Sequence, residues 1–509
     1  MSVSRSKKAL YSVIAGIVYE IVELVCGLIL PRLILSAFGS AYNGITSSIT
    51  QFISVISLMK AGIGGVTRAA LYKPLAEGNT DELSAIVNQT QSFLRKVALL
   101  FMAFILVFAA IYPIFVCDDF DWLFTFTLIV IISFAKFAQY YFGLAAQMVL
   151  AADQKQYISV IFGIISVVLN TTVSVVLIKL GATIHVVKLG SSVVYFLSPV
   201  LANYYVKKKY NINSKVRPEK DYVKQRWDAV GHEVANFINS NTDVMVLTVL
   251  STLENVSVYT VYNYVILCLR KILNTFVTGL GAAFGNMFAL KQYKLMEENM
   301  RLYEMIVFSF SSIVYSTALV MITPFVAIYT HGVTDADYHQ PLFGIILTFA
   351  AVIACFRTPY ETVVKALGHY KQTRNQAFVE AGINIAVSVV CVFKFGLVGV
   401  AVGTLCAMLY RTVVYATYLS KNLIQRSIFC FIKHAVITLS INAVTLLLSR
   451  LYMPSEFSII GWITYATITT LISVALTVVT DFVFYKEDFL MTLRKMIAML
   501  KRKKSKKNA

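Results

Sequence analysis

"NTTVSVVLIKLG" (residues 170–181) and "NIAVSVVCVFKFG" (residues 384–396) share Asn, Val, Ser, Val and Val at one fixed offset, then Lys-x-Gly after a one-residue insertion. The turns before them also match, with Lys155-Gln156 before the first stretch and Lys371-Gln372 before the second. Chance similarity between two valine-rich helices is the alternative explanation. Because each stretch ends the fifth apolar segment of a set of six, we instead predict two parallel copies of one six-helix unit.

The composition places this repeat in a membrane. Hydrophobic residues make up 58% of the 509 residues and charged residues only 14%, and the mean hydropathy is +0.71. One soluble core does not bury this much apolar surface. Crossing a bilayer takes roughly 20 helical residues, and apolar segments of that length occur near 9–35, 43–70, 97–116, 121–150, 157–179, 182–205, 226–250, 256–288, 302–329, 341–366, 377–394, 397–420, 430–449 and 458–485.

These segments predict an all-α polytopic membrane protein with about 14 transmembrane helices, namely two parallel six-helix repeats plus two C-terminal helices. The expected parts are an N-terminal six-helix bundle (1–205), a basic cytoplasmic linker (206–225), a C-terminal six-helix bundle (226–420), two additional transmembrane helices (421–485) and an amphipathic, polybasic cytoplasmic tail (486–509). Two parallel halves around a site near the membrane midplane form a transporter architecture. The tail is expected to lie on the inner surface against anionic lipid.

The distribution of cations predicts the orientation of the chain. Most of the 45 Lys and Arg residues lie in the N-terminal tail, in alternate loops and in the C-terminal tail, whereas the other loops hold only Lys179, Lys394 and Arg450. Because Lys and Arg gather on the cytoplasmic side of membrane proteins, we expect both termini to be cytoplasmic.

Several cations lie inside the predicted spans themselves: Arg32, Lys60, Lys136, Lys188, Arg270, Lys271, Arg357 and Arg411. A charge at the bilayer centre costs about 2.5 to 3.5 kcal/mol on insertion scales, so such groups face a bundle interior or a wet cavity. Snorkelling to the interface is the alternative for Arg32 and Lys188, which lie near span ends. It does not suit residues that lie about 15 Å, or ten helical residues, from either end of a span.

Acidic residues within the spans offer ion pairing as a second alternative. Glu361 follows Arg357 by one helical turn, so the two predict a pair as readily as a site. The spans that hold Lys60, Lys136 and the Arg270-Lys271 pair carry no acid at that depth. We therefore predict a central cavity with an uncompensated positive lining, which favours an anionic passenger.

Two helices carry polar faces beside these cations. His232, Asn236, Asn239 and Asp243 recur at helical spacing, and Glu20 and Glu23 share a face with two glycines. Glu20, Glu23 and Asp243 are candidates for proton or sodium coupling, although hydrogen bonds between helices and pairing with the cavity cations explain them equally well. No metal-ligand spacing is recognised, and we expect no cofactor.

The run "LPRLILSAFGSAYNGITSSITQFISVISLMKAGIGGVTRAALYKPLAEGN" (30–79) and the later "NTDVMVLTVLSTLENVSVYTVYNYV" (241–265) carry a family resemblance. The chain resembles the polysaccharide-transport, or Wzx-type, branch of the multidrug/oligosaccharidyl-lipid/polysaccharide exporter superfamily over essentially its whole length. The best matches lie in residues 28–80 and 236–265. These motifs carry no information on which sugar is handled.

The resemblance implies a flippase that turns an undecaprenyl-diphosphate-linked oligosaccharide from the inner to the outer leaflet. It implies a multi-pass protein of the bacterial cytoplasmic membrane, a monomer with glycan polymerases as its partners. We expect no nucleic-acid partner, because the basic C-terminal tail is expected to lie against lipid. An ion-coupled multidrug or cation exporter of the same superfamily is the alternative function. A membrane enzyme is disfavoured because the longest predicted outer loop is too short for a catalytic site.

Overall fold

Helices make up all the regular structure of the residues that the structure describes. The computed structural model describes residues 5–116, 118–218, 230–277, 280–424, 426–454 and 458–491, and all regular elements in these ranges are helices. Within them, 12 helices are long and apolar enough to cross a membrane. The predicted polytopic all-α class is confirmed. The predicted span 43–70 and residues 230–250 of the predicted span 226–250 are also helical, but the described side chains cover only part of each.

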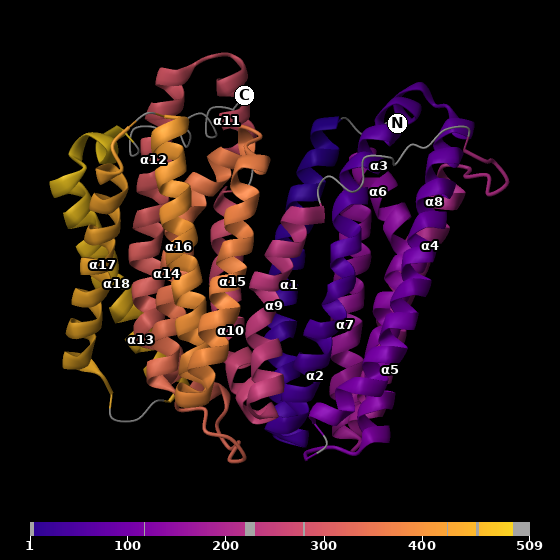
Figure 1. Cartoon of the computed structure of the whole chain (residues 1–509), viewed down its shortest axis with the longest axis horizontal. Coiled ribbons are helices and arrows are strands. Elements are labelled where there is room, and N and C mark those ends of the chain that lie inside the picture. Colours follow the sequence, from indigo (N-terminus) through magenta and orange to yellow (C-terminus); the bar gives the residue numbers. More distant parts are fainter. Residues whose placement is uncertain are drawn as a thin grey trace. The chain divides into compact units, whose positions relative to one another are not determined.

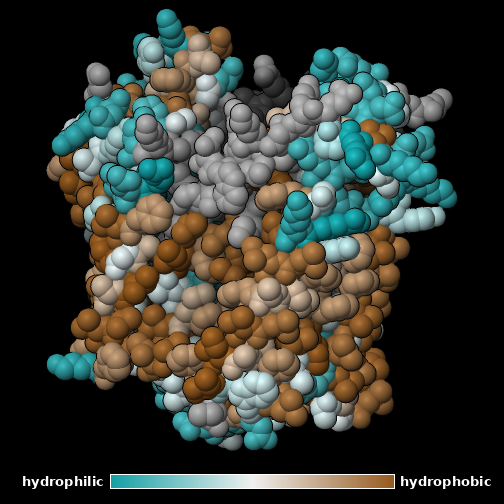
Figure 2. All heavy atoms as spheres, turned by 45° about the vertical axis from the view of Figure 1, so that its right-hand side comes forward, coloured by the Kyte–Doolittle hydropathy of each residue, from teal (hydrophilic) through white to brown (hydrophobic). Residues whose placement is uncertain are grey.

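The chain forms two compact units, Met1–Val258 with Gly332–Ala336, and Tyr259–His331 with Asp337–Ala509. The boundaries predicted at residues 206, 226, 421 and 486 follow the repeat and the charge pattern rather than compactness, and they stay a prediction. Apolar side chains cover the middle of the visible face in Figure 2, and polar side chains gather at its two ends. This distribution is the one expected of a bundle that crosses a bilayer.

The first unit consists of long helices that run side by side (Figure 1). Its elements are α1 (Arg5–Phe38), α2 (Ser40–Ile53), η1 (Ser54–Ile56), α3 (Ser57–Glu77), α4 (Thr80–Ile111), η2 (Tyr112–Phe115), α5 (Trp122–Ala138), η3 (Gln139–Gly143), α6 (Leu144–Ala152), α7 (Gln156–Lys179), α8 (Ile184–Lys209), α9 (Val230–Leu250) and the first turns of α10 (Leu253–Val277).

The second unit begins within α10 and continues to the C-terminal helices. Its other elements are α11 (Leu280–Ala289), α12 (Tyr293–Phe310), η5 (Ser311–Tyr315), α13 (Ser316–Tyr329), α14 (Pro341–Ala366), α15 (Tyr370–Phe395), α16 (Leu397–Asn422), α17 (Phe429–Ser449), η6 (Arg450–Tyr452) and α18 (Ile459–Phe484).

Hydrogen bonds between buried polar side chains join α2 and η1 to α9 and α10 in the first unit. Asn43 Nδ2 donates to Ser257 Oγ at 2.8 Å, Ser48 Oγ lies 2.7 Å from Thr248 Oγ1, and Ser54 Oγ donates to Asn241 Oδ1 at 3.0 Å. Such pairs hold membrane helices together where apolar burial gives no preference. They explain why α9 packs within the first unit.

The segment Gly332–Ala336 belongs to the first unit because it caps α2. Asp335 Oδ2 accepts from the Ser40 backbone N at 2.6 Å, and Asp335 Oδ1 accepts from Ser40 Oγ at 2.7 Å. A carboxylate at a helix N-terminus satisfies backbone N–H groups that have no partner within the helix. Gly39 leaves room for it, since a methyl group added there would lie 2.6 Å from Asp335 Oδ2.

The repeated stretches of the sequence occupy comparable places in α7 and α15. Ser174 on α7 and Ser388 on α15 are fully buried, as is Asn384, and Asn170 is nearly so. Ser174 Oγ lies 3.2 Å from Ser191 Oγ of α8, and Ser388 Oγ donates to the Val400 carbonyl of α16 at 3.4 Å. Each stretch thus uses its polar residues to bind the helix that follows it.

Candidate functional site

A cavity of about 590 Å³ lies in the second unit, between α10, α11, η5 and α14. Its polar lining consists of Arg270, Asn274, Tyr315, Cys355, Arg357, Thr358, Glu361, Thr362 and Lys365. Tyr315 belongs to the π turn η5 that joins α12 to α13. Such turns add a residue to a helix and are frequent at functional sites.

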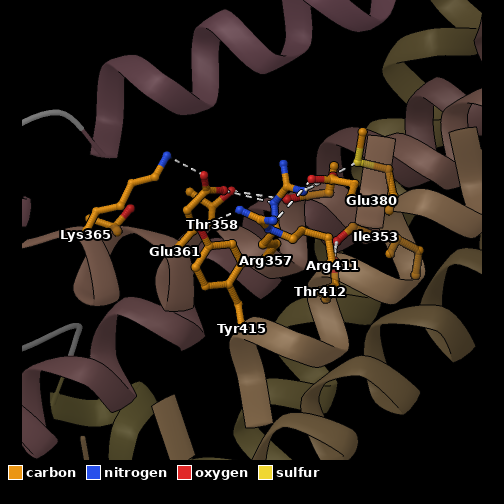
Figure 3. Close-up of polar contacts among 12 residues, drawn as sticks. Ile353, Arg357, Thr358, Glu361, Lys365, Glu380, Arg411, Thr412 and Tyr415 are labelled. Atoms are coloured by element: carbon orange, nitrogen blue, oxygen red, sulfur yellow. Dashed lines mark hydrogen bonds and ion pairs between the residues drawn. The ribbon is translucent and has the colours of Figure 1, made fainter. Parts of the chain in front are cut away.

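One face of α14 supplies three charged side chains to this cavity. Arg357, Glu361 and Lys365 are spaced four residues apart, so they follow one another along one side of the helix. Arg357 Nε lies 2.9 Å from Glu361 Oε2, and Lys365 Nζ lies 2.6 Å from Glu361 Oε1 (Figure 3). Glu361 is therefore held between two cations of its own helix.

Neighbouring helices extend this cluster behind the cavity. Glu380 of α15 accepts from Arg357 Nη1 at 2.8 Å, and its second oxygen lies 3.7 Å from Arg411 Nε of α16. Arg411 is 3% exposed, and its guanidinium carbon lies 4.7 Å from the ring centroid of Tyr415 (Figure 3). Arg411 Nη2 also donates to the Tyr415 hydroxyl at 3.0 Å.

Cations outnumber carboxylates among the described residues of this region. The ion pairs here join the three cations Arg357, Lys365 and Arg411 to the two carboxylates Glu361 and Glu380. Arg270 adds another positive charge, and among the described residues it forms no hydrogen bond or ion pair. An excess of positive charge in a partly buried site attracts an anion and stabilises it there.

A second cavity, of about 680 Å³, lies in the first unit. Lys136 and Arg68 are its cations, and no carboxylate is among the lining residues that the structure describes. Amide and hydroxyl groups complete the polar lining: Tyr19, Gln139, Gln147, Gln156, Ser159, Ser166, Tyr195 and Ser198. Gln139 belongs to the π turn η3, so both cavities receive a side chain from such a turn.

The structure therefore brings Arg270 and Arg357 to one cavity and Lys136 to the other. Arg411 is buried behind the first of these cavities, at Glu380. Lys271 and Arg32 are half-buried on α10 and α1, and neither is among the described residues that line a cavity.

The polar candidates are placed on two helices of the first unit. Glu20 and Glu23 are half-buried on α1, and Asp243 is buried on α9. The side chains of Lys60, His232, Asn236 and Asn239 lie outside the described residues, although α3 and α9 include their positions.

Sequence reasoning missed several charged residues. Arg68 and Lys365 line the two cavities, yet they lie so close to the ends of the predicted spans 43–70 and 341–366 that they are not counted among the cations inside the spans. Glu304 is 1% exposed and accepts from the Tyr360 hydroxyl and from Arg426 Nη2. The position of Glu304 near the start of an apolar span was the available signal, because an acid there requires a partner.

Comparisons with known proteins place the fold. No family model matches the chain, and no curated protein matches it. A solved structure of the lipid II flippase MurJ in an inward closed conformation has a TM-score of 0.72 and 15% identity, covering 94% of this chain and 99% of that one. An inward-facing multidrug resistance MATE family transporter of the MOP superfamily has a TM-score of 0.62 and 13% identity, covering 83% and 99%.

A third solved structure is a MOP superfamily transporter from Pyrococcus furiosus, described as having a binding pocket of reverse polarity. Its TM-score is 0.56 at 10% identity, and the match covers 86% of this chain and 97% of that one. At these identities the likeness shows the fold alone. The chain therefore has the fold of these flippase and transporter structures. This result is coarser than the Wzx-type branch predicted from the sequence, which stays a prediction.

Proposed function

We propose that this protein is a flippase that moves an undecaprenyl-diphosphate-linked oligosaccharide from the inner to the outer leaflet by alternating access. The observation that carries this proposal is the cationic cavity of the second unit, where Arg270 lines the wall without a partner among the described residues. The similar solved structure of a lipid II flippase supports a lipid-linked substrate.

The cavity chemistry suits a diphosphate. A guanidinium group binds phosphate oxygens through two parallel N–H donors, whereas an ammonium group acts as a point charge. Arg270 offers the first kind of contact. Lys365 at the same wall pairs with Glu361, but its side chain is 33% exposed, so its ammonium group can offer the second kind. Arg357 is already held by Glu361 and Glu380, so we assign it to fixing the wall rather than to direct binding.

The first unit provides a second place for polar parts of the substrate. Lys136 and Arg68 supply positive charge there, and Gln139 and Gln147 supply amide groups that bind sugar hydroxyls. We further assign Arg32, Lys60, Lys271 and Arg411 to the cationic surroundings of the substrate path. Glu20, Glu23 and Asp243 are the groups we propose for any coupling to protons or sodium, with Asn236, Asn239 and His232 beside them.

We also propose the membrane, the topology, the oligomeric state and the partners that this function implies. The protein acts in a bacterial cytoplasmic membrane with both termini in the cytoplasm, as a monomer, and polysaccharide-polymerising proteins take up its product. Membrane lipids are its other partners.

An ion-coupled multidrug or cation exporter is the second candidate. It is favoured by the similar MATE family structures and by the buried carboxylate of Asp243. A cationic passenger would have to enter a cavity whose lining holds an excess of positive charge, which is unfavourable. Transport of anionic and cationic substrates therefore separates the two functions.

The test uses proteoliposomes that contain purified protein and a fluorescent undecaprenyl-diphosphate-linked glycan. Wild-type protein is expected to move the glycan between leaflets, and Arg270→Ala is expected to reduce the rate at least tenfold because it removes the unpaired guanidinium. Arg450→Ala is the matched control, since Arg450 is an exposed cation at the end of α17. It is expected to leave the rate unchanged.

Three outcomes contradict the proposal. They are wild-type flipping by Arg270→Ala, equal losses in both variants, and active export of a cationic dye by a protein that does not flip the glycan. Circular dichroism and elution from size exclusion show whether each variant is folded.

A further inference from the structure

A third cavity, of about 700 Å³, lies in the first unit at the polar end of α4, away from the residues assigned to the substrate. Its walls are the first half of α4, Lys207 in the last turn of α8, and the segment 214–218 that follows α8. Arg95, Lys96, Lys207, Lys215 and Arg217 line it. No carboxylate is among its described lining residues, so its charge is wholly positive. We call it the basic crevice.

Hydrogen bonds fix one wall of the basic crevice against the other. Asn88 Nδ2 of α4 donates to the carbonyls of Asn213 and Val216, both at 2.9 Å. The Asn213 backbone N donates to Ser84 Oγ of α4 at 3.1 Å, and the Lys215 backbone N donates to Asn213 Oδ1 at 3.0 Å. Like charges that line one cavity repel each other, so this bonding keeps Lys215 and Arg217 at the same cavity as Arg95 and Lys96 against an electrostatic cost.

Two buried donors at the wall of the basic crevice have no acceptor among the residues that the structure describes. Gln91 is 5% exposed, and its Nε2 forms no hydrogen bond with any residue in the described ranges. Arg95 Nε, one helical turn further along α4, is also buried and forms no hydrogen bond with a described residue. Leaving a buried donor unsatisfied costs about 1 to 3 kcal/mol. The Arg95 guanidinium is held in place by the Tyr141 ring, with 5.0 Å from its carbon to the ring centroid.

The missing partner is therefore an acceptor that carries negative charge. Its position along the helices indicates where such a group comes from. Directly after Lys96, α4 continues as an apolar helix on which Leu99 and Leu100 are both 60% exposed. Just before Lys207, Leu201 and Tyr204 of α8 are also exposed, at 41% and 64%. The basic crevice thus lies where the apolar surface of these two helices ends, which is the depth of lipid headgroups.

We propose that the basic crevice binds the phosphate of an anionic membrane phospholipid, with its acyl chains along the apolar surfaces of α4 and α8. Gln91 and Arg95 donate to the phosphate oxygens, and the surrounding lysines and Arg217 neutralise its charge. The site holds the start of the segment between α8 and α9 to the membrane surface. This proposal does not depend on the transported substrate.

The test measures binding of pyrene-labelled phosphatidylglycerol and of pyrene-labelled phosphatidylcholine to the purified full chain in detergent. Wild-type protein is expected to bind phosphatidylglycerol at least tenfold more tightly. Lys96→Gln with Lys215→Gln removes two exposed cations without touching the core. It is expected to weaken phosphatidylglycerol binding about 25-fold, since each surface cation contributes on the order of a factor of five and the two factors multiply.

Two further variants keep the test decisive. Gln91→Leu changes no charge and is expected to weaken phosphatidylglycerol binding at least threefold, because it removes one of the donors. Lys179→Gln with Arg450→Gln removes two exposed cations from other turns of the chain and is expected to have no effect. Equal losses in the two charge-removing variants would show a general charge effect and overturn the proposal.

A separate arm tests the source of the phosphate. Inorganic phosphate, added at constant ionic strength, is expected to compete only weakly with the lipid. Should phosphatidylglycerol bind no better than phosphatidylcholine while inorganic phosphate protects Arg95 from a guanidine-modifying reagent, the crevice takes a soluble phosphate compound, and the lipid assignment is wrong.

Discussion

Arg270 and Arg357 are both mid-span arginines at one cavity, but their surroundings are opposite. Arg357 is clamped between Glu361 and Glu380, whereas Arg270 has no bonded partner in the part of the chain that the structure describes. The sequence shows that both residues are deep in apolar segments. It does not show that Glu380, which is 23 positions from Arg357, reaches it from another helix.

This difference predicts that substitution by methionine affects stability at Arg357 but not at Arg270. Arg357→Met takes from Glu361 one of its two cations and from Glu380 its ion pair at 2.8 Å, so two largely buried carboxylates each lose a close partner. Breaking a buried ion pair in this way costs about 3 to 5 kcal/mol. The thermal unfolding midpoint of the purified variant in detergent, followed by intrinsic fluorescence, is expected to fall by several degrees.

Two variants serve as controls for that loss. Arg357→Met with Glu380→Gln removes the stranded charge and is expected to recover most of the stability. Arg270→Met is expected to unfold at the wild-type temperature, since no described bond is broken, while flipping is lost. A fall in the unfolding midpoint of Arg270→Met as large as that of Arg357→Met would contradict the distinction.

At the scale of elements, the apolar pattern predicts where membrane helices lie but not where they begin. The segment predicted at 97–116 belongs to α4, which starts at Thr80, and the segment predicted at 302–329 belongs to a helix that starts at Tyr293. The first turns of α4 are polar, and Asn79 caps them by accepting from the Glu82 backbone N at 3.0 Å. A hydropathy pattern does not detect these polar first turns of a helix. It also does not reveal the π turns η3 and η5.

Small residues that let helices approach can be predicted from spacing, and their effect is testable. Gly399 and Gly403 of α16 lie against α15, where a methyl group added at Gly403 would lie 2.1 Å from Ser388 Oγ and 2.8 Å from the Ser388 backbone N. Gly403→Ala is therefore expected to push the two helices apart and to cost about 1 to 3 kcal/mol. Thermal unfolding in detergent measures this loss.

Gly382 is the matched control for that variant. It lies within the adjacent α15, and a methyl group added there meets no atom within 4 Å. Gly382→Ala is expected to be neutral or to stabilise the protein by up to about 1 kcal/mol, because alanine favours a helix more than glycine does. If Gly403→Ala proves as stable as Gly382→Ala, the close approach of α15 and α16 at Gly403 does not contribute to the stability of the protein.

At the scale of the whole molecule, composition predicts the membrane class well, and 12 helices among the described residues are candidate spans where the sequence predicts about 14. The candidate site is predicted less well, because charge partners come from separate helices. Arg270 and Lys136 could be selected from depth alone, whereas Glu304 and its partner Arg426 are 122 positions apart. Pairing across such a separation depends on helix packing, and a single sequence does not encode it in any local pattern.

Orientation is the remaining property of the whole molecule that charge alone predicts. Lys and Arg are scarce in one set of loops and plentiful in the other, so a tag after residue 509 and a tag in the turn at Gly181 are expected on opposite sides of the membrane. Gly181 has a φ of 75° and open space around it, so a short insertion there is tolerated. In intact bacterial cells an impermeant protease is expected to remove only the tag at Gly181, whereas in inverted vesicles it removes only the C-terminal tag. Cleavage of both tags from the same side would contradict the predicted topology, and with it the direction of transport that we propose.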